Sequence, residues 1–447
     1  MNNLITILQF IFLGLMPRLS NQQINTNIIH VTIVNYHGSR APLWSYPTDP
    51  YGESYWARYG GLGQITPKGL LQSYNLGQYI KNYYSTYLTP SYSPQRVSAT
   101  SVDSDPALVS TNAFLAGMFP PSNSDQLWSP TVSWFPIPVH PAESIYNPIV
   151  KKDCPKHKQL VKESMNSEDF KETESKYMDL VTNISGFTGS PSLNFNNLSH
   201  VFDNAYAKLS SNLPLELWLS EHLKNLTDAN NKLLELKYGS MEKSRLIAGG
   251  ILLDIIKNIR DKMNGTQNEI QVYSFLDFHL ISLFELLDLN FNMTYIPFGT
   301  SLIFELRKDT DDLHYINIML KSNNVSEPTS INPVKMNECD QLCNFGNFFD
   351  ILIRRTMNDV TKECSWDESG SMATTDSIFN TNFFSTPCPT VNEMNMTSFT
   401  EDQIRDKDNT IMELNRLEIS LIITVSILSL IVFALLISFG LYAYKKK

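Results

Sequence analysis

The chain has 447 residues, of which 42% are hydrophobic and 18% are charged, and its formal net charge is −10. These proportions are ordinary for a globular protein, and the length permits a large core together with an inserted subdomain. An acidic chain without a basic stripe does not suit a polyanion, so we expect no nucleic-acid partner.

The chain begins with an apolar segment, residues 4–16, that is too short to span a bilayer. Its length is that of the apolar region of a secretory signal peptide, although no lysine or arginine precedes it. We therefore expect residues 1–20 to be a signal peptide and the following domain to be exported.

A β-branched, apolar run over residues 28–34 predicts the first buried strand. His37 and Gly38 come directly after it, and Arg40 and Pro42 follow. A strand that ends on His-Gly places the imidazole at a sheet edge, where glycine lets a ligand approach the backbone. The arginine offers a planar, charged group for an oxyanion. Taken alone, however, this short pattern suits a hydrogen-bonded core histidine better than an active site.

The rest of the exported region divides into three parts. Strand and helix patterns alternate over residues 28–121, which indicates an α/β layer with a mostly parallel sheet. Residues 122–240 are more polar and helical in pattern, and residues 241–366 return to the sheet. In this last part we predict helices over residues 246–263 and 280–289 and strands over residues 270–275, 300–306 and 315–320.

The C-terminal part predicts a membrane anchor. Residues 367–418 lack apolar periodicity and read as a flexible stem, whereas residues 419–444 contain no charge and are long enough to span a bilayer. The three lysines at 445–447 would stay cytoplasmic by the positive-inside rule, which makes the chain a single-pass type I membrane protein with a lumenal or extracellular ectodomain. Seven glycosylation sequons precede the span, at Asn183, Asn197, Asn225, Asn264, Asn292, Asn324 and Asn395.

Several segments match one family in register. Residues 37–42 fit the opening motif of the histidine acid phosphatases, the family of prostatic and lysosomal acid phosphatase, at every position but the first. Further segments resemble the same family, namely residues 46–50, 63–69, 74–80, 115–121 and 243–250 and the cysteine pattern of Cys339, Cys343 and Cys364. The chain therefore resembles this family over roughly residues 28–366.

The resemblance implies the histidine phosphatase fold, in which an α/β core carries an α-helical cap. The core would comprise residues 28–121 and 241–366, and the cap residues 122–240. The resemblance also implies the disulfides Cys154–Cys364 and Cys339–Cys343, which suit an exported protein. Cys388, in the predicted stem, is then either free or available for pairing between chains. Members of the family are often dimers, so a homodimer is possible here.

The resemblance further implies how the site works. Histidine phosphatases hydrolyse phosphomonoesters through a phosphohistidine, without a metal or an organic cofactor. A neutral imidazole attacks phosphorus, and an aspartic acid protonates the leaving oxygen. His37 occupies the nucleophile position and Asp277 the proton-donor position, and Arg40 matches one of the arginines that bind the phosphate.

Three other positions depart from the family pattern. Tyr36 and Thr100 stand where the family has phosphate-binding arginines, and Leu276 stands where it has a second histidine. Among nearby basic residues, Arg96 is too far along its strand from Thr100, His279 faces elsewhere on a helix, and Arg58 in a long loop could swing in. The register at Thr100 is open to error because residues 101–106 diverge from the family.

We therefore expect a membrane-anchored acid phosphatase-like protein whose activity is lost or strongly reduced and whose pocket has a binding or interaction role. An active acid phosphatase with weak or altered substrate preference is the alternative. If the pocket still binds, its ligand would be a phosphomonoester or another small anion. In an inert pocket, His37, Arg40 and Asp277 could also persist as a structural cluster that includes an Arg40–Asp277 ion pair.

Overall fold

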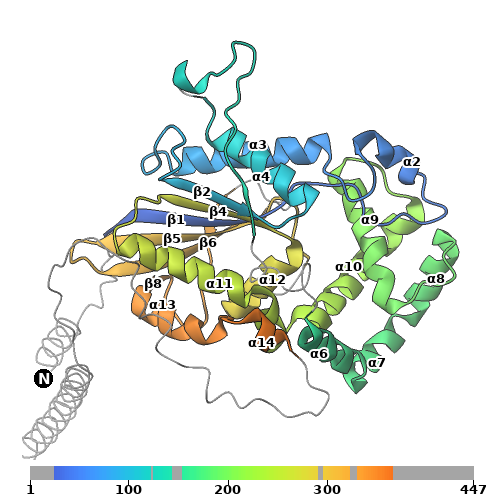
Figure 1. Cartoon of the computed structure of the whole chain (residues 1–447). Coiled ribbons are helices and arrows are strands. Elements are labelled where there is room, and N and C mark those ends of the chain that lie inside the picture. The colour runs from blue at the N-terminus through green and yellow to red at the C-terminus, as the bar shows by residue number, and fades with distance from the viewer. Residues whose placement is uncertain (1–24, 122–123, 143–153, 290–294, 323–329, 366–447) are drawn as a thin grey trace, which may run out of the picture. The chain divides into compact units, whose positions relative to one another are not determined.

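The computed structural model of the chain describes residues 25–121, 124–142, 154–289, 295–322 and 330–365 (Figure 1). The chain divides into two compact units, residues 1–369 and 370–447, and all described residues belong to the first. The predicted signal peptide, the stem with Cys388, the membrane span, and the sequons at Asn292, Asn324 and Asn395 lie outside the described residues. Among the helices that are described, none is long and apolar enough to cross a membrane.

A mixed sheet forms the centre of the first unit. Within the described residues its strand order is β3-β2-β4-β1-β5-β6-β7, and β8 pairs with β6. The strands are β1 (Thr26–Tyr36), β2 (Val97–Ser101), β3 (His140–Pro141), β4 (Ile270–Phe275), β5 (Ser301–Asp309), β6 (His314–Lys321), β7 (Asn332–Pro333) and β8 (Leu342–Asn344).

The expectation of a mostly parallel sheet is wrong for the C-terminal half of the sheet. Strands β1, β4, β2 and β3 pair in parallel, but β5 is antiparallel to both β1 and β6, and β6 is antiparallel to β7 and β8. For β6 the reason is the length of its connection to β5, whereas the longer connection from β4 to β5, residues 276–300, permits either direction. Residues 310–313 join β5 to β6, and so short a turn permits only a hairpin, because a parallel pair needs a crossover of a dozen or more residues.

Helices cover both faces of the sheet (Figure 1). Helices α3 (Pro67–Tyr83) and α4 (Asp105–Met118) pack on one face, and α11 (Met241–Met263), α12 (Asp277–Leu286) and α13 (Phe345–Leu352) lie on the other. The strands are buried from both sides, as the run of seven buried residues that ends β1 shows. Burial of this apolar surface supplies the main stabilisation. The elements α2 (Glu53–Trp56) and η1 (Ala57–Tyr59) lie in the long loop between β1 and α3.

A second group of helices lies beside the sheet (Figure 1). It has its own hydrophobic core, in which Phe195, Leu198, Leu219 and Leu226 are buried almost completely. Its elements are α6 (Pro155–Met165), α7 (Glu168–Lys176), α8 (Met178–Thr188), η4 (Phe195–Asn197), α9 (Leu198–Ser210) and α10 (Leu217–Tyr238). We call this group the cap.

Residues 124–142 differ from the prediction, which assigns them to the helical cap. They form a projecting arm with one short turn, η2 (Ser124–Gln126), and end in β3, which joins the main sheet beside β2 (Figure 1). Prolines explain the lack of helix: Pro130, Pro136, Pro138 and Pro141 each remove a backbone donor and clash with a preceding helical turn.

Two disulfides are present, and they are the pairs that the family resemblance implies. Cys154–Cys364 joins the residue before α6 to the end of α14 (Val360–Cys364). Cys339–Cys343 closes a short loop that ends in β8. A 3-10 turn, η5 (Ile353–Arg355), lies between α13 and α14.

Candidate active site

Strand β1 delivers the predicted nucleophile to the carboxyl edge of the parallel strands. The strand is paired on both sides, by β4 and β5, and the carbonyl of His37 accepts a hydrogen bond from the Gly299 amide. Gly38 is required next, because a Cβ atom there would overlap the carbonyl of Gly69 on α3. The backbone turn after β1 is thus wedged between the sheet and α3.

The His37 imidazole has the form that a nucleophile needs. Its Nδ1 atom donates to the carbonyl of Gly38 at 2.8 Å, so Nε2 carries the lone pair. Burial, together with the nearby charge of Arg40, lowers the pKa of His37 to about 3. His37 lines a cavity and is 2% exposed. Its ring is therefore neutral over the pH range in which acid phosphatases would work.

The guanidinium of Arg40 is held by a partner that sequence reasoning missed. Its Nη2 and Nη1 atoms lie 2.8 and 3.2 Å from the two carboxylate oxygens of Asp203, on α9 of the cap. Asp203 also accepts a hydrogen bond from the Leu43 amide at 2.7 Å. Although burial disfavours the charged form, Asp203 raises the pKa of Arg40. The direct ion-pair partner of Arg40 is thus Asp203 of the cap, and the charge of Asp277 adds to the rise in the pKa of Arg40.

Asp277, the predicted proton donor, begins α12 directly after β4. Its Oδ1 atom accepts a hydrogen bond from the Phe278 amide at 2.8 Å, which is a typical role for an acidic residue at a helix N-terminus. Burial raises the pKa of Asp277, and the charge of Arg40 offsets this only in part. A raised pKa favours the protonated carboxyl, which is the form that a general acid requires.

The three replaced positions have different surroundings. The Tyr36 ring lies 4.4 Å from the His37 ring and 5.3 Å from the Phe298 ring, measured between centroids. Tyr36 and Leu276 line the same cavity as His37. Thr100 does not: it lies within β2, opposite Tyr273, and its hydroxyl is 3.5 Å from the side-chain amide of Gln271.

The cavity has a volume of about 530 Å³ and brings core and cap residues together. It contains His37, Arg40 and Asp277, whereas no local pattern in the sequence points to its cap residues. The aromatic and aliphatic residues of its lining are Tyr36, Leu43, Phe202, Tyr206, Leu234, Tyr238, Leu276, Phe278, Tyr295, Ile296 and Phe298. The other lining residues are Gly63, Gln64, Ser104, Asp105, Pro106, Ser199, His200, Asp203, Asn230 and Lys237.

The basic residues considered as substitutes do not take part. Arg58 donates to the carbonyl of Tyr55 and lies over its ring, with 4.1 Å from guanidinium to centroid. Arg96 pairs with Glu269 at the opposite end of β4. His279 is fully buried, and its Nδ1 accepts from the Leu276 amide.

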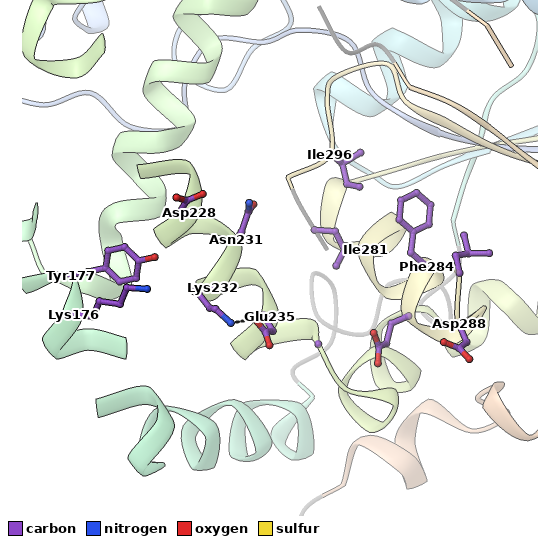
Figure 2. A pocket seen from close by; sticks show the side chains of 13 residues that line it. Lys176, Tyr177, Asp228, Asn231, Lys232, Glu235, Ile281, Phe284, Asp288 and Ile296 are labelled. Carbon is purple, nitrogen blue, oxygen red and sulfur yellow. Dashed lines mark hydrogen bonds and ion pairs between the residues drawn. The ribbon is translucent and has the colours of Figure 1, made fainter. Parts of the chain in front are cut away.

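A second cavity, of about 630 Å³, lies between α10 of the cap and α12 (Figure 2). Lys232 and Glu235, on α10, form an ion pair at its edge, and Ile281 and Phe284 face it from α12. This cavity has Ile296 in common with the first but contains none of the predicted site residues. We therefore place the candidate active site in the smaller cavity.

Comparison with known proteins agrees with this geometry. Residues 27–321 match the histidine phosphatase superfamily (branch 2). The chain belongs to this family. It is 31% identical to human lysosomal acid phosphatase over 345 residues, which cover 75% of this chain and 79% of the relative. It is also 31% identical to rat prostatic acid phosphatase over 353 residues, which cover 75% of this chain and 88% of the relative.

Solved structures of similar fold include two phytases. The apo form of Hafnia alvei phytase aligns with a TM-score of 0.58 at 15% identity and covers 76% of this chain and 99% of its own. The phytase from Citrobacter braakii aligns with a TM-score of 0.57 at 17% identity, over 76% of this chain and 100% of its own. At such identities the likeness concerns the fold alone.

Proposed function

We propose that this histidine acid phosphatase-like chain has lost most or all of its phosphomonoesterase activity and uses its pocket for binding. The observation that carries the proposal is the state of Arg40. It is the one arginine among the described residues that line the pocket, and Asp203 already neutralises it. A phosphoryl group carries charge on three oxygens in the transition state and needs cations placed around them.

The size of the expected loss follows from the replaced positions. Removing one preorganised transition-state donor costs about 10²–10³ in rate in other enzymes. Tyr36 offers a neutral hydroxyl in place of a cation, and Leu276 offers no polar group. Even with the non-additivity usual within one site, these losses leave little turnover.

A weakly active phosphatase is the second candidate, and one observation favours it. His37 is neutral with Nε2 unprotonated, and burial favours the protonated form of Asp277. The groups that would attack phosphorus and protonate the leaving group thus keep suitable protonation states, while Arg40 alone remains of the groups that would hold the phosphate.

The similarity to lysosomal acid phosphatase supports a lumenal ectodomain. This similarity, the predicted signal peptide and the apolar residues 419–444 together support the proposal that the chain is a single-pass type I membrane protein of the endomembrane system or the cell surface. A homodimer and the glycosylation of the predicted sequons are part of the same proposal.

An assay of the purified full-length chain with a chromogenic aryl phosphate at about pH 5 tests the function, with His37→Ala as the control. We expect turnover at the level of the control. Turnover of about one per second or more that His37→Ala abolishes would overturn the proposal. Partial recovery of activity on combining Tyr36→Arg, Thr100→Arg and Leu276→His would support it, and Thr100→Arg should contribute least because Thr100 lies outside the pocket.

A further inference from the structure

The pocket has an aromatic wall where a phosphate-binding site would carry cations. The ring of Phe298 stacks with that of Tyr36 and with that of Tyr206, at centroid distances of 5.3 and 4.9 Å. The His37 ring lies 5.6 Å from Phe298, and Tyr295 packs edge-on against Tyr206 at 5.0 Å. All five residues line the cavity. These rings pack on one another, and Tyr36 and Phe298 are only 4% and 2% exposed, so the wall presents closely packed apolar surface beside the nucleophile position.

A second aromatic pair lies on the cavity lining at the start of α12. Tyr238 and Phe278 stack at 5.8 Å with their planes 17° apart, and both line the cavity. Leu276 comes directly before Asp277 and adds aliphatic surface there. A flat ligand would thus meet apolar groups from the cap, from β1 and from α12.

The charges of the pocket do not favour an anion. Among the described residues that line it, the cations are Arg40 and Lys237, and the acids are Asp105, Asp203 and Asp277. Arg40 is paired with Asp203 and lies over the Phe298 ring at 5.5 Å. Burial lowers the pKa of Lys237, and Asp277 attracts its charge. Aromatic faces are electron-rich and repel anions.

The polar groups of His37 and Tyr36 in the cavity lining can form hydrogen bonds with an uncharged group of a ligand. The Nε2 atom of His37 can accept a hydrogen bond because Nδ1 carries the proton. Tyr36 is 4% exposed, and its hydroxyl is able to donate or accept. A hydroxyl on an aromatic ring could therefore donate to His37 while the ring packs against the apolar lining.

We propose that the pocket binds a flat aromatic molecule with an uncharged hydroxyl group, in preference to a phosphate ester. The volume of about 530 Å³ is in the range of small-molecule sites and admits a two-ring compound. This inference rests on the proposed function, because an efficient phosphatase would have to hold phosphate in the same place.

Three probes with the same ring system and different charge test the inference: 2-naphthol, 2-naphthyl phosphate and 2-naphthylmethylamine. Each is titrated calorimetrically into the full-length chain in detergent at about pH 7, where a phosphate monoester is mostly a dianion. We expect 2-naphthol to bind at least about tenfold more tightly than 2-naphthyl phosphate. Equal or tighter binding of the phosphate or of the amine, or no binding of 2-naphthol, would overturn the inference.

Matched variants locate the binding. Phe298→Leu removes the central ring of the wall and should weaken 2-naphthol binding about threefold to tenfold. Phe187→Leu makes the same change at a half-exposed ring of the cap outside the pocket and should leave binding unchanged. This control also corrects for partition of the probe into detergent. Tyr36→Arg should reverse the preference toward 2-naphthyl phosphate, whereas equal effects of the two Phe→Leu variants would contradict the inference.

Release of inorganic phosphate from 2-naphthyl phosphate is measured in the same samples, and it tests the function separately. Release that depends on His37 would contradict the proposed function whatever the affinities are. Absence of both release and 2-naphthol binding would leave the proposed function standing and overturn the aromatic ligand.

Discussion

Arg40 of the core and Asp203 of the cap form a two-point ion pair, with nitrogen–oxygen distances of 2.8 and 3.2 Å. The two residues are 163 positions apart in the sequence. Both side chains are largely buried, at 7% and 18% exposure, so solvent screens their attraction only weakly. The pair occupies the guanidinium that the family resemblance assigns to phosphate.

Replacing Asp203 by asparagine should free that guanidinium for an anion. Asn keeps a carbonyl oxygen for Arg40 and for the Leu43 amide but removes the counter-charge. Because two charges a few ångströms apart interact by several kcal/mol in a partly buried site, we expect inorganic phosphate to bind roughly tenfold more tightly or better. Calorimetry with phosphate checks this, and Asp311→Asn, an exposed residue of the β5–β6 turn, is the control. Unchanged phosphate affinity in Asp203→Asn would contradict our account of Arg40.

Lys208 on α9 should be essential for stability. Its ammonium lies 2.8 Å from Asp49 and 3.2 Å from Glu216, and the side chains of Lys208 and Asp49 are fully buried. The Lys208 ammonium also donates to the Tyr46 hydroxyl at 2.8 Å. Lys208→Met leaves buried carboxylates without a counter-charge, which costs about 3–5 kcal/mol in the free energy of unfolding.

Urea denaturation of Lys208→Met measures that cost. The matched control is Lys232→Met, which breaks an exposed pair with Glu235 and should cost less than about 1 kcal/mol. Similar midpoints for the two variants would show that the buried cluster contributes no more than a surface pair.

His279 should make the fold sensitive to acid. Burial lowers the pKa of His279 to about 3 in the folded state, below the ordinary value of 6.5. A depressed pKa means that this group's contribution to stability is fully present above about pH 6.5 and is lost as pH falls toward 3. At about pH 5 the loss from this group is roughly 2 kcal/mol.

His279→Asn tests this contribution, because the asparagine oxygen can accept from the Leu276 amide as His279 Nδ1 does but cannot titrate. We expect the variant to lose less unfolding free energy than the parent between about pH 7 and pH 5. His140→Asn, at an exposed residue, controls for the change in composition. Parallel pH profiles for the parent and His279→Asn would refute the assignment.

The disulfide Cys154–Cys364 should contribute more than Cys339–Cys343. The first spans 210 positions and the second only 4. A cross-link that closes a longer loop removes more entropy from the unfolded chain. Changing both Cys154 and Cys364 to serine should cost about 2–5 kcal/mol, measured by thermal or urea unfolding. An equal or larger cost from the corresponding Cys339 and Cys343 double variant would contradict the loop-length explanation.

The sequence predicted the elements whose residues repeat with a clear period. The run that forms β1 and the strands β4, β5 and β6 follow from local apolar patterns, and the His37 motif places the site at the end of β1. The antiparallel direction of β5 relative to β1 could not be predicted in this way, because residues 276–300 between β4 and β5 are long enough for either direction.

The partner of Arg40 could not be predicted in the same way. Asp203 is one acidic residue on a polar helix, and only the packing of the cap against the loop after β1 brings it to Arg40. The role of Phe298 could not be predicted from the sequence either, because its ring stacks with Tyr36 and Tyr206, which lie in distant segments of the chain. The family resemblance places Thr100 at the position of a phosphate-binding arginine, but Thr100 does not line the pocket.

Successive residues of α9 hold the loop after β1. Asp203 binds Arg40, Asn204 donates to the Trp44 carbonyl at 3.1 Å and to Asp49 at 2.7 Å, and Lys208 binds Asp49. Opening the cap would break all of these contacts together. We therefore expect a ligand of this cavity to exchange through its mouth while the cap stays closed, because a hinge motion of the cap would have to break buried ion pairs and hydrogen bonds at once.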